Sequence, residues 1–479
     1  MPSQYDAIVV GSGPNGLSAA VTLAERGLSV LVVEAYDRIG GGTRSAELTL
    51  PGFLHDVCSA IHPMAALSPA FQHFGLERRG VTWVHAPVAL SHPLDDGRVA
   101  LLRSSLEETA EGLEADAKAY RTLVGTFVER APLLFAELLK PLRFPTHPFL
   151  LARFGWRALR SARYIARHYF TTATARALLA GCAAHSFLPL DAAGSSAIGL
   201  TLLVAAHVKG WPCAKGGSAS ISLALANYLS SLGGTVETNH LVSDWRELPK
   251  SRALLFDTSP RTMARICRDR LPTGYVEQLE RFRSAPGVFK LDWALSRPIP
   301  WRNRECGESG TVHLGGTLEE IAQSELEVSQ GVHPTRPYVL VAQQSLLDPS
   351  RVPPGKHTGW AYCHVPNGST VDMTSAIERQ VERFAPGFRD CILARHTMTT
   401  ADLFRYNPNY RGGDITGGAS DIGQILMRPT LRWSPYATPT PGIYLCSSST
   451  PPGGGVHGMC GYHAAALALR RTFGLTVAI

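Results

Sequence analysis

The feature that most constrains this sequence of 479 residues is an unbroken strand, glycine-rich turn, helix and strand at its start. Residues 5–10 (YDAIVV) have the apolar, β-branched composition of a buried parallel strand, and residues 17–26 continue as a helix. Gly27 stands where a helix commonly ends, and residues 28–33 (LSVLVV) form a second apolar run. This order predicts a βαβ unit, in which a helix joins two parallel strands.

The turn in this unit has glycine at the three places where a dinucleotide site needs it. Gly11 permits the tight turn, Gly13 lets the backbone approach a pyrophosphate, and Gly16 allows the helix to pack closely on the strand. Glu34 follows the second strand and can accept hydrogen bonds from a ribose diol, while its charge disfavours a 2′-phosphate. The predicted dinucleotide contacts are Gly11, Ser12, Gly13, Pro14, Asn15, Gly16, Glu34 and Ala35.

The residues that follow resemble a known flavoprotein segment. Arg38-Ile-Gly-Gly41-Gly42-Thr43-Arg44 is similar to the second signature of the superfamily that contains the amine oxidases and the phytoene desaturases. In that family the double glycine passes beneath the pyrophosphate of FAD, and an arginine with a nearby Ser or Thr helps to hold it. The usual arginine is Gly42 here, so Arg44 is the candidate substitute. The resemblance implies FAD contacts from Arg38, Gly41, Gly42, Thr43 and Arg44.

The end of the chain carries the same resemblance. Residues 442–466 read as a strand, a glycine-rich turn and a helix, and look like the C-terminal flavin motif of the phytoene desaturase-like dehydrogenases. A helix N-terminus at this place favours the negative charge of a reduced flavin. The motif implies cofactor contacts from Gly455, Val456 and His457.

A central segment completes the resemblance, which spans essentially the whole chain and implies that the cofactor is FAD. Residues 211–218 and 233–239 resemble the family segment whose returning strand lies against the adenine, near Leu241 and Val242.

The three FAD-contacting segments are far apart in the sequence, so the FAD domain is expected to be discontinuous. The expected fold is α/β, with a Rossmann-like FAD domain of the GR2 type formed by residues 1–66, 209–262 and 413–479. Residues 67–208 and 263–412 are expected to form an α+β substrate domain on an antiparallel sheet. Runs at 81–85, 88–92 and 98–102, with a turn at 95–97, predict part of that sheet, and residues 107–170 are largely helical in pattern.

Charge is concentrated in one part of the chain. The net charge of the chain is +7. Residues 121–170 contain nine basic and two acidic residues, a net charge of 9 − 2 = +7, so this range accounts for the whole excess and the rest of the chain is close to neutral. A helix over residues 151–170 would align Arg153, Arg157, Arg160, Arg163 and Arg167 on one face. This pattern indicates either a solvated face or a peripheral contact with an anionic membrane.

The composition excludes several classes. No nucleic-acid-binding motif accompanies the basic residues. The nine cysteines show no zinc or disulfide spacing, so reduced thiols and no metal site are expected. Neither a secretory signal nor an apolar run long enough for a membrane span is evident, and a cytoplasmic protein is expected.

Candidate catalytic residues lie near the predicted flavin. His457 lies within the C-terminal turn, and Asp56, with its neighbour His55 and with His62, follows the second FAD segment. Lys215 directly precedes a glycine pair. We expect it to contact a loop or a phosphate, and not to act as the catalytic lysine of the amine oxidases does. Tyr462 and His463 begin the last helix.

The leading interpretation is an FAD-dependent dehydrogenase or desaturase that takes hydrogen from a largely apolar small molecule by hydride transfer to flavin N5. A single dinucleotide unit favours oxygen, a quinone or a protein carrier as the electron acceptor. The alternatives are a redox-neutral isomerase of the carotenoid isomerase type, a flavin amine oxidase, and a non-catalytic protein that retains FAD for stability.

Overall fold

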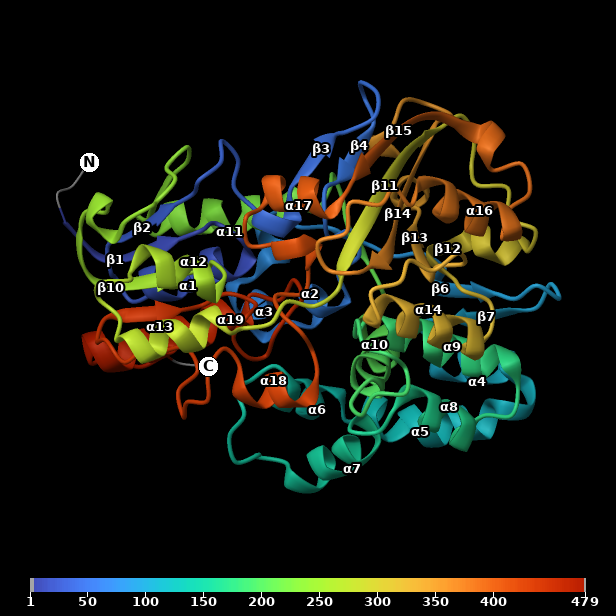
Figure 1. The fold of residues 1–479 in the computed structure, drawn as a ribbon, viewed down its shortest axis with the longest axis horizontal. Helices are drawn as coiled ribbons and strands as arrows, with labels where there is room; N and C mark the ends of the chain where they lie inside the picture. The colour runs from blue at the N-terminus through green and yellow to red at the C-terminus, as the bar shows by residue number, and fades with distance from the viewer. Residues whose placement is uncertain (1–3, 478–479) are drawn as a thin grey trace.

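The computed structural model describes residues 4–477, which build two large sheets side by side (Figure 1) and two sheets of only two strands. The first sheet has the strand order β16 (Ile443–Leu445), β10 (Lys250–Phe256), β1 (Gln4–Val10), β2 (Val30–Val33) and β9 (Thr235–Glu237). All neighbouring strands in it are parallel. The start, the middle and the end of the chain therefore meet in one Rossmann-like sheet, as expected.

Helices cover both faces of this sheet. On one face lie α1 (Pro14–Ala24), α11 (Ala219–Ser231) and α19 (Met459–Ala468), whose small residues allow a close approach. A Cβ at Gly461 of α19 would lie 1.7 Å from the carbonyl oxygen of Asn15, so only glycine fits where α19 crosses α1. On the other face lie α12 (Pro260–Ile266) and α13 (Thr273–Glu280), so this layer continues past the expected limit at residue 262.

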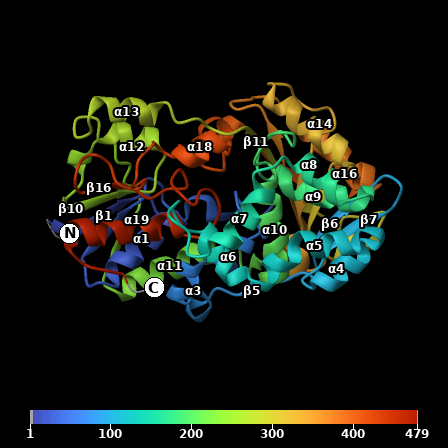
Figure 2. The same cartoon turned by 90° about the horizontal axis from the view of Figure 1, so that it is seen from below.

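The second sheet has seven strands and forms the other end of the molecule (Figure 2). Its order is β15 (Ile392–Met398), β11 (Gly287–Leu295), β14 (His357–Val365), β13 (Val339–Ala342), β12 (Ser309–Leu314), β6 (Val88–Pro93) and β7 (Val99–Leu102). All pairs are antiparallel except β12 with β6. The predicted class, an α/β fold with a Rossmann-like domain beside an α+β half, is confirmed.

One predicted strand of this sheet is wrong. Within residues 81–85, only β5 (Trp83–Val84) is extended, and it pairs with β8 (Cys213–Ala214) in a separate two-stranded sheet. The other two runs form the hairpin of β6 and β7, whose turn contains Gly97 at a positive φ of 88°. The division into domains stays a prediction, and residues 1–3 and 478–479 of the expected FAD domain lie outside the described residues.

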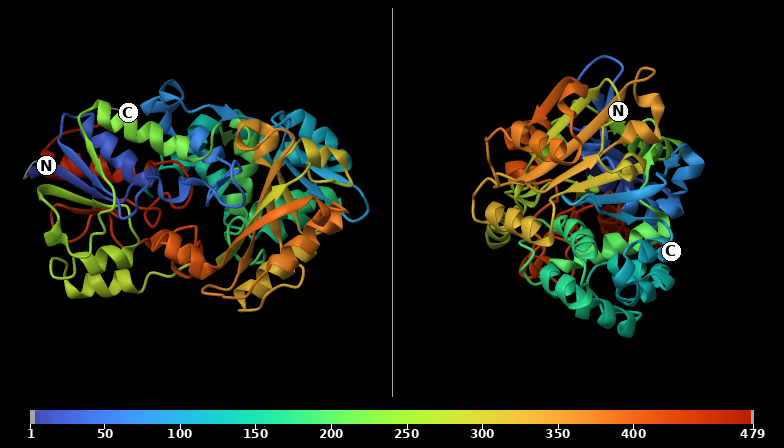
Figure 3. Two further views of the ribbon diagram at one scale, coloured as in Figure 1. Left: turned by 90° about the horizontal axis from the view of Figure 1, so that it is seen from above. Right: turned by 90° about the vertical axis from the view of Figure 1, so that its right-hand side faces the viewer.

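A group of helices gathers beside the second sheet (Figure 3). One face of the sheet packs on α16 (Thr374–Phe384), and α14 (Leu318–Ser329) packs on α9. The helical part of the chain comprises α4 (Leu106–Gly112), α5 (Ala117–Glu129), α6 (Ala131–Leu138), α7 (Pro148–Ala158), α8 (Ala162–Tyr169), α9 (Ala173–Ala184) and α10 (Ser196–Lys209). The remaining elements used below are β3 (Ser45–Glu47), β4 (Leu54–Asp56), α2 (Pro63–Leu67), α3 (Pro69–Phe74), α17 (Thr400–Tyr406) and α18 (Ile422–Met427).

The single helix predicted over residues 151–170 is wrong, because it is two helices, α7 and α8. The hydroxyl of Ser161 accepts a hydrogen bond from the N–H of Tyr164 and begins a new helix there. Arg157 is buried and donates to the hydroxyl of Tyr169, while Arg163 pairs with Asp191. No continuous cationic stripe results.

Two further expectations concern helices that could span a membrane and the state of the cysteines. Among residues 4–477, no helix combines the length and the apolar character needed to cross a bilayer. All nine cysteines are buried free thiols.

Candidate functional site

The glycine-rich turn between β1 and α1 forms a backbone-lined trough. Gly11 has a φ of +102°, which favours glycine, and Gly13 is the residue that precedes the first turn of α1. A Cβ at Gly16 would lie 2.1 Å from the carbonyl oxygen of Gly11. The turn therefore leaves the N-terminus of α1 facing the cavity, where the positive end of the helix favours a phosphate.

Asp257 is a carboxyl group in this trough that sequence analysis missed. It follows β10, and its Oδ2 accepts the N–H of Gly16 at 2.9 Å. Burial, helped by the nearby charge of Glu34, raises the pKa of Asp257 to about 7, although the N–H groups of Gly16 and Gly13 act in the opposite direction. The parallel pairing of β1 with β10 brings Asp257 there, across 241 residues of sequence.

Glu34 lies at the carboxyl end of β2, as expected for a ribose ligand. Its carboxylate accepts hydrogen bonds from the N–H of Ser12 at 3.1 Å and the N–H of Tyr36 at 3.1 Å. It also forms a buried ion pair of 3.0 Å with Nη2 of Arg44. The guanidinium of Arg44 stacks on the rings of Tyr36 and Tyr406. Arg44 therefore fixes Glu34 beside the cavity.

Arg38 does not contact the cavity, contrary to the prediction. Its side chain is 69% exposed and lies beside Asp37 at 3.9 Å. Only its carbonyl oxygen contributes, by accepting a hydrogen bond of 3.0 Å from Nε of Arg44. Of the two arginines that the resemblance implied, Arg44, the candidate substitute, lines the cavity and Arg38 does not.

The second glycine segment packs directly against the first. Gly41 has a φ of +52°, and a Cβ there would lie 3.1 Å from the Cα of Gly13. At Gly42 a Cβ would lie 2.4 Å from the hydroxyl of Tyr410, so a tyrosine fills the place next to the missing arginine. Thr43 hydrogen-bonds the carbonyl oxygen of Gly40 and lines the cavity.

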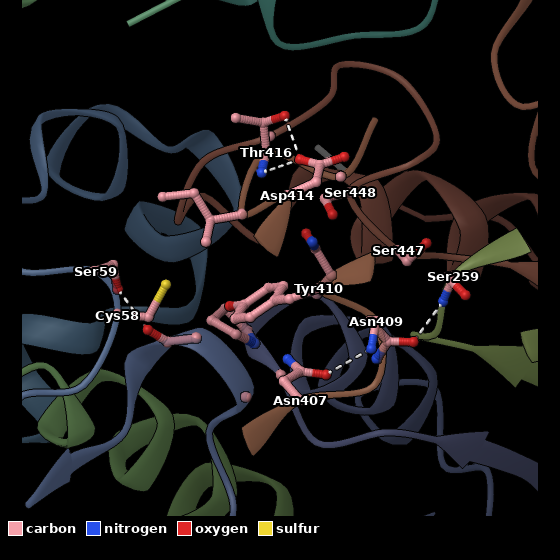
Figure 4. Close-up of a pocket in the computed structure, with 18 of the residues that line it drawn as sticks. Cys58, Ser59, Ser259, Asn407, Asn409, Tyr410, Asp414, Thr416, Ser447 and Ser448 are labelled. Atoms are coloured by element: carbon pink, nitrogen blue, oxygen red, sulfur yellow. Dashed lines mark hydrogen bonds between the residues drawn. The ribbon is translucent and has the colours of Figure 1, made fainter. Parts of the chain in front are cut away.

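The central and C-terminal segments also contribute to this end of the cavity. Leu241 and Val242 line the cavity beside Glu34, and so do Gly455 and Val456. A Cβ at Gly454 would lie 2.4 Å from the carbonyl oxygen of Thr416, so residues 414–416 run against the C-terminal turn. Figure 4 shows Thr416 and Asp414 above the cavity, with Tyr410 near its centre.

His457 does not face the cavity. Its Nδ1 accepts the N–H of Met459 at 3.0 Å, and its Nε2 donates to the carbonyl oxygen of Gly453 at 3.2 Å. Burial lowers the pKa of His457 to about 4, so the ring is neutral and both nitrogens are used within its own turn. The geometry supports a structural part for His457 and does not support the predicted catalytic role.

Asp56 and His55 also lie outside the cavity lining. Asp56 ends β4 and accepts from Nη1 of Arg351 at 2.7 Å, from Ser218 N–H at 2.7 Å and from the hydroxyl of Ser45 at 2.8 Å. The Nε2 of His55 bonds the hydroxyl of Thr49 at 2.8 Å, and burial lowers the pKa of His55 to about 4. Both side chains connect elements of the fold, so a catalytic role is not supported by their positions.

Of the remaining candidate residues, one lines the cavity and the other three lie elsewhere in the fold. His62 lines the cavity and bonds the hydroxyl of Ser218 at 2.7 Å. Lys215 is exposed and does not line the cavity. His463 bonds the carbonyl oxygen of Leu139 at 2.9 Å, and Tyr462 is buried in helix packing.

The dinucleotide trough opens into a second compartment with different walls. The whole cavity has a volume of about 1080 Å³, at the upper end of the range for ligand sites. Residues 58–64 lie along the passage, and α10 contributes Ile198 and Leu202. The second sheet supplies Leu340, Trp360 and Tyr362 as a wall, joined by Phe187 after α9. The walls of this compartment are mostly apolar and aromatic.

Beside this wall, on the same face of the sheet, lies a buried charged cluster that sequence analysis missed. Lys290 of β11 pairs with Asp292, and its Nζ lies 5.7 Å from the ring centroid of Trp360. His55 and His396 approach Asp292 at 3.6 and 3.5 Å. The alternation of β11 places Lys290 and Asp292 on the cavity side, opposite the core residues Phe289 and Leu291. A lysine within an otherwise apolar strand is the signal that would have marked it.

The fold and the cavity define a structural class. The chain has a Rossmann-like dinucleotide-binding domain joined to a sheet-walled compartment, and this fold is similar to that of solved structures such as putrescine oxidase. Residues 9–74 match the family described as an NAD(P)-binding Rossmann-like domain.

Several known proteins are similar to the chain over nearly its full length. The chain is 26% identical to pyridine nucleotide-disulfide oxidoreductase domain-containing protein 2 of Rattus norvegicus, over 98% of this chain and 94% of that protein. An oxidoreductase from Methanosarcina mazei has a similar structure, with a TM-score of 0.65 at 14% identity, over 96% of this chain and 99% of the other. A double mutant of putrescine oxidase gives a TM-score of 0.65 at 18% identity, over 98% and 99%.

Proposed function

We propose that this chain is an FAD-dependent oxidoreductase that removes hydrogen from a largely apolar organic substrate. The observation that carries the proposal is a single continuous cavity, with a glycine-lined dinucleotide trough at one end and apolar, aromatic walls at the other. Oxygen, a quinone or a protein carrier would take the electrons onward. The finer assignment to a phytoene desaturase-like dehydrogenase rests on the sequence motifs.

The residues present fit FAD. Backbone, and not side chains, forms the trough where Gly41 meets Gly13, because a Cβ at Gly41 would come within 3.1 Å of the Gly13 Cα. The N-terminus of α1 would hold the pyrophosphate, and Glu34 the ribose. Gly455 and Val456 would face the pyrimidine end of the flavin. Bound there, FAD would accept the hydrogen taken from a substrate C–H bond.

The chain's own part in the reaction is to bind the substrate, to orient it and to exclude water from it. Trp360 and Tyr362 form one rigid wall, because both lie on the same face of β14 and are buried. Leu340 and Phe187 extend this wall and exclude water from it. Such surroundings suit an uncharged framework held in one orientation.

An amine oxidase is the alternative that the fold raises. The carboxyl groups that line the cavity, Glu34, Asp257 and Asp414, belong to the dinucleotide end or the loop beside it. Among the described residues, those that the sheet contributes to the cavity lining include no carboxylate, and Asp292 on the same face is already paired with Lys290. The apolar wall therefore favours a neutral substrate over an amine.

Anaerobic mixing with substrates separates these functions. We expect terpenoid or long-chain alkyl compounds to bleach the visible band of bound flavin, whereas putrescine and cyclohexylamine leave it unchanged. Bleaching by the amines alone would contradict the proposal. Conversion of an apolar substrate to an isomer without any bleaching would instead indicate the redox-neutral isomerase.

An apolar substrate would be drawn from a lipid bilayer, and an exposed apolar surface of this chain suits contact with one. This surface, called the apolar rim here, consists of Phe144, Phe149, Trp156, Leu431 and Trp433, of which Phe144, Phe149 and Trp433 are 92%, 90% and 100% exposed. It lies around α6, α7 and α18 along the lower edge of Figure 1. The cations Arg143 and Arg153 are exposed beside it. Aromatic groups beside cations suit an anionic lipid surface.

Binding to vesicles tests this contact. Replacing Phe149 and Trp433 together by glutamate should lower co-sedimentation with phosphatidylserine-containing vesicles by at least about tenfold, since each buried aromatic contributes roughly 1.5–3 kcal/mol. Leu223→Glu and Leu393→Glu, at exposed positions on α11 and β15, should leave it unchanged. Equal vesicle binding by all variants would contradict a membrane role for the rim.

A further inference from the structure

One polar group in the apolar compartment has no part in the function proposed above. His185 follows α9 and lines the cavity, with Phe187 and Trp211 as neighbours in the lining. Its Nε2 lies 3.0 Å from Nε2 of His313 on β12. His313 is fully buried, whereas His185 is only partly buried. The other edge of the His185 ring, with Nδ1, is therefore left for the cavity.

A hydrogen bond between two imidazole nitrogens needs one donor and one acceptor, and the surroundings of His313 decide which is which. The Nδ1 of His313 is buried without a hydrogen-bond partner among the described residues. It faces Gly181 of α9, where a Cβ would lie only 2.7 Å away. A proton on that nitrogen would be a buried donor without an acceptor, at a cost of about 1–3 kcal/mol. A bare lone pair there faces a Cα–H group instead.

The neighbouring His92 does not relieve this constraint. Its Nε2 donates to the carbonyl oxygen of Gly316 at 2.8 Å, and its own Nδ1 faces the same side of Gly181 without a partner. Burial lowers the pKa of His92 to about 4, that of His185 to about 3 and that of His313 well below its usual value, so all three rings are neutral. Each ring therefore carries one proton, and on His313 that proton is on Nε2.

The geometry points to a fixed tautomer: His313 donates from Nε2 to His185, and His185 in turn presents the N–H of its Nδ1 to the cavity as a hydrogen-bond donor. This inference rests on the proposed function and narrows it. The substrate is a largely apolar compound with a neutral carbonyl oxygen at the end that reaches His185. A carboxylate would face neutral rings and apolar walls, where its charge is costly.

Ligand binding to the flavin-loaded protein tests the inference without turnover. The probes are a medium-chain methyl ketone and the terminal alkene of the same length, followed by the fluorescence of Trp211 and Trp360, which line the cavity. The ketone should bind about tenfold more tightly, because a net hydrogen bond is worth roughly 1 kcal/mol or somewhat more. In His185→Phe the ratio should fall to about one or below, because the ketone oxygen then lacks the donor that His185 supplied. Thr201→Val, at another polar lining position, should keep it.

A preference that persists in His185→Phe, or no preference in the wild type, would overturn the inference. Nitrogen-15 NMR of the wild-type histidines provides a second test that needs no variant. It should show His185 protonated at Nδ1 and His313 at Nε2, and the reverse pattern would also overturn the inference. These outcomes are separate from the proposed function, because flavin content and its bleaching by apolar compounds are measured independently. A ketone preference without any bleaching would contradict the function and leave the role of His185 intact.

Discussion

Gly41→Val should abolish FAD binding, with the flavin content of the purified protein falling at least tenfold. Gly41 adopts a φ of +52°, and its Cβ would come within 3.1 Å of the Cα of Gly13. A branched side chain there would force apart the two glycine segments that form the trough. The neighbour is backbone of the first segment, so relaxation is costly. Flavin released on denaturation, per mole of chain, measures the effect.

The matched control is Gly27→Val. Gly27 also has a positive φ, +73°, but no atom lies within 4 Å of its Cβ position. This variant should lose stability from backbone strain, of the order of 1 kcal/mol, and still bind FAD. Equal flavin content in the two variants would mean that the contact between Gly41 and Gly13 does not shape the cofactor site.

Asp56→Asn should destabilise the fold by about 1.5–3 kcal/mol, because it removes a charged hydrogen bond to the buried guanidinium of Arg351 and leaves that group paired with Asp348 alone. Asp56 and Arg351 are both fully buried, and Asp56 also accepts hydrogen bonds from Ser218 and Ser45. Urea unfolding at neutral pH measures the loss. The double variant with Arg351→Met should recover part of it, since the guanidinium charge is then absent and Asp348 keeps its hydrogen bonds from Gly216 and Ser350.

The pH dependence of this stability loss shows whether it comes from the charge of Asp56. Burial alone raises the pKa of the Asp56 carboxyl, but Arg351 and the hydrogen bonds from Ser218 and Ser45 outweigh it and hold the pKa below its usual value. A carboxyl with a lowered folded pKa stabilises above its unfolded pKa of about 3.9 and loses that contribution as the pH falls through the folded pKa. The gap in stability between wild type and Asp56→Asn should thus be full at neutral pH and shrink in acid. A folded variant with unchanged stability that loses only turnover would restore the catalytic interpretation.

The dinucleotide end was predictable because its determinants are local. Gly11, Gly13, Gly16 and Glu34 occupy one strand, turn, helix and strand, and each has its function within that unit. Asp257 shares the same trough but arrives through the pairing of β1 with β10, which no local pattern marks.

Predictions about individual side chains were less accurate where they assumed that a residue near the cofactor segments in sequence also faces the cavity in space. His457 and Asp56 both lie close in sequence to cavity residues, yet hydrogen bonds within the fold occupy their polar atoms. The wall residues Trp360 and Tyr362 come from β14, whose alternation indicates a strand but not what the strand faces. The helix over 151–170 failed for another reason, because the cap at Ser161 outweighed the 3.6-residue periodicity.

The most direct test of the central claim is to identify the cofactor itself. The purified protein is denatured, and the released material is compared by chromatography with FAD, FMN, NAD and NADP. The structure predicts FAD in an amount equal to that of the chain, because the trough at Gly13 and Gly41 continues past the C-terminal turn into the apolar compartment. A colourless protein that releases no flavin and takes up none on reconstitution would contradict the account.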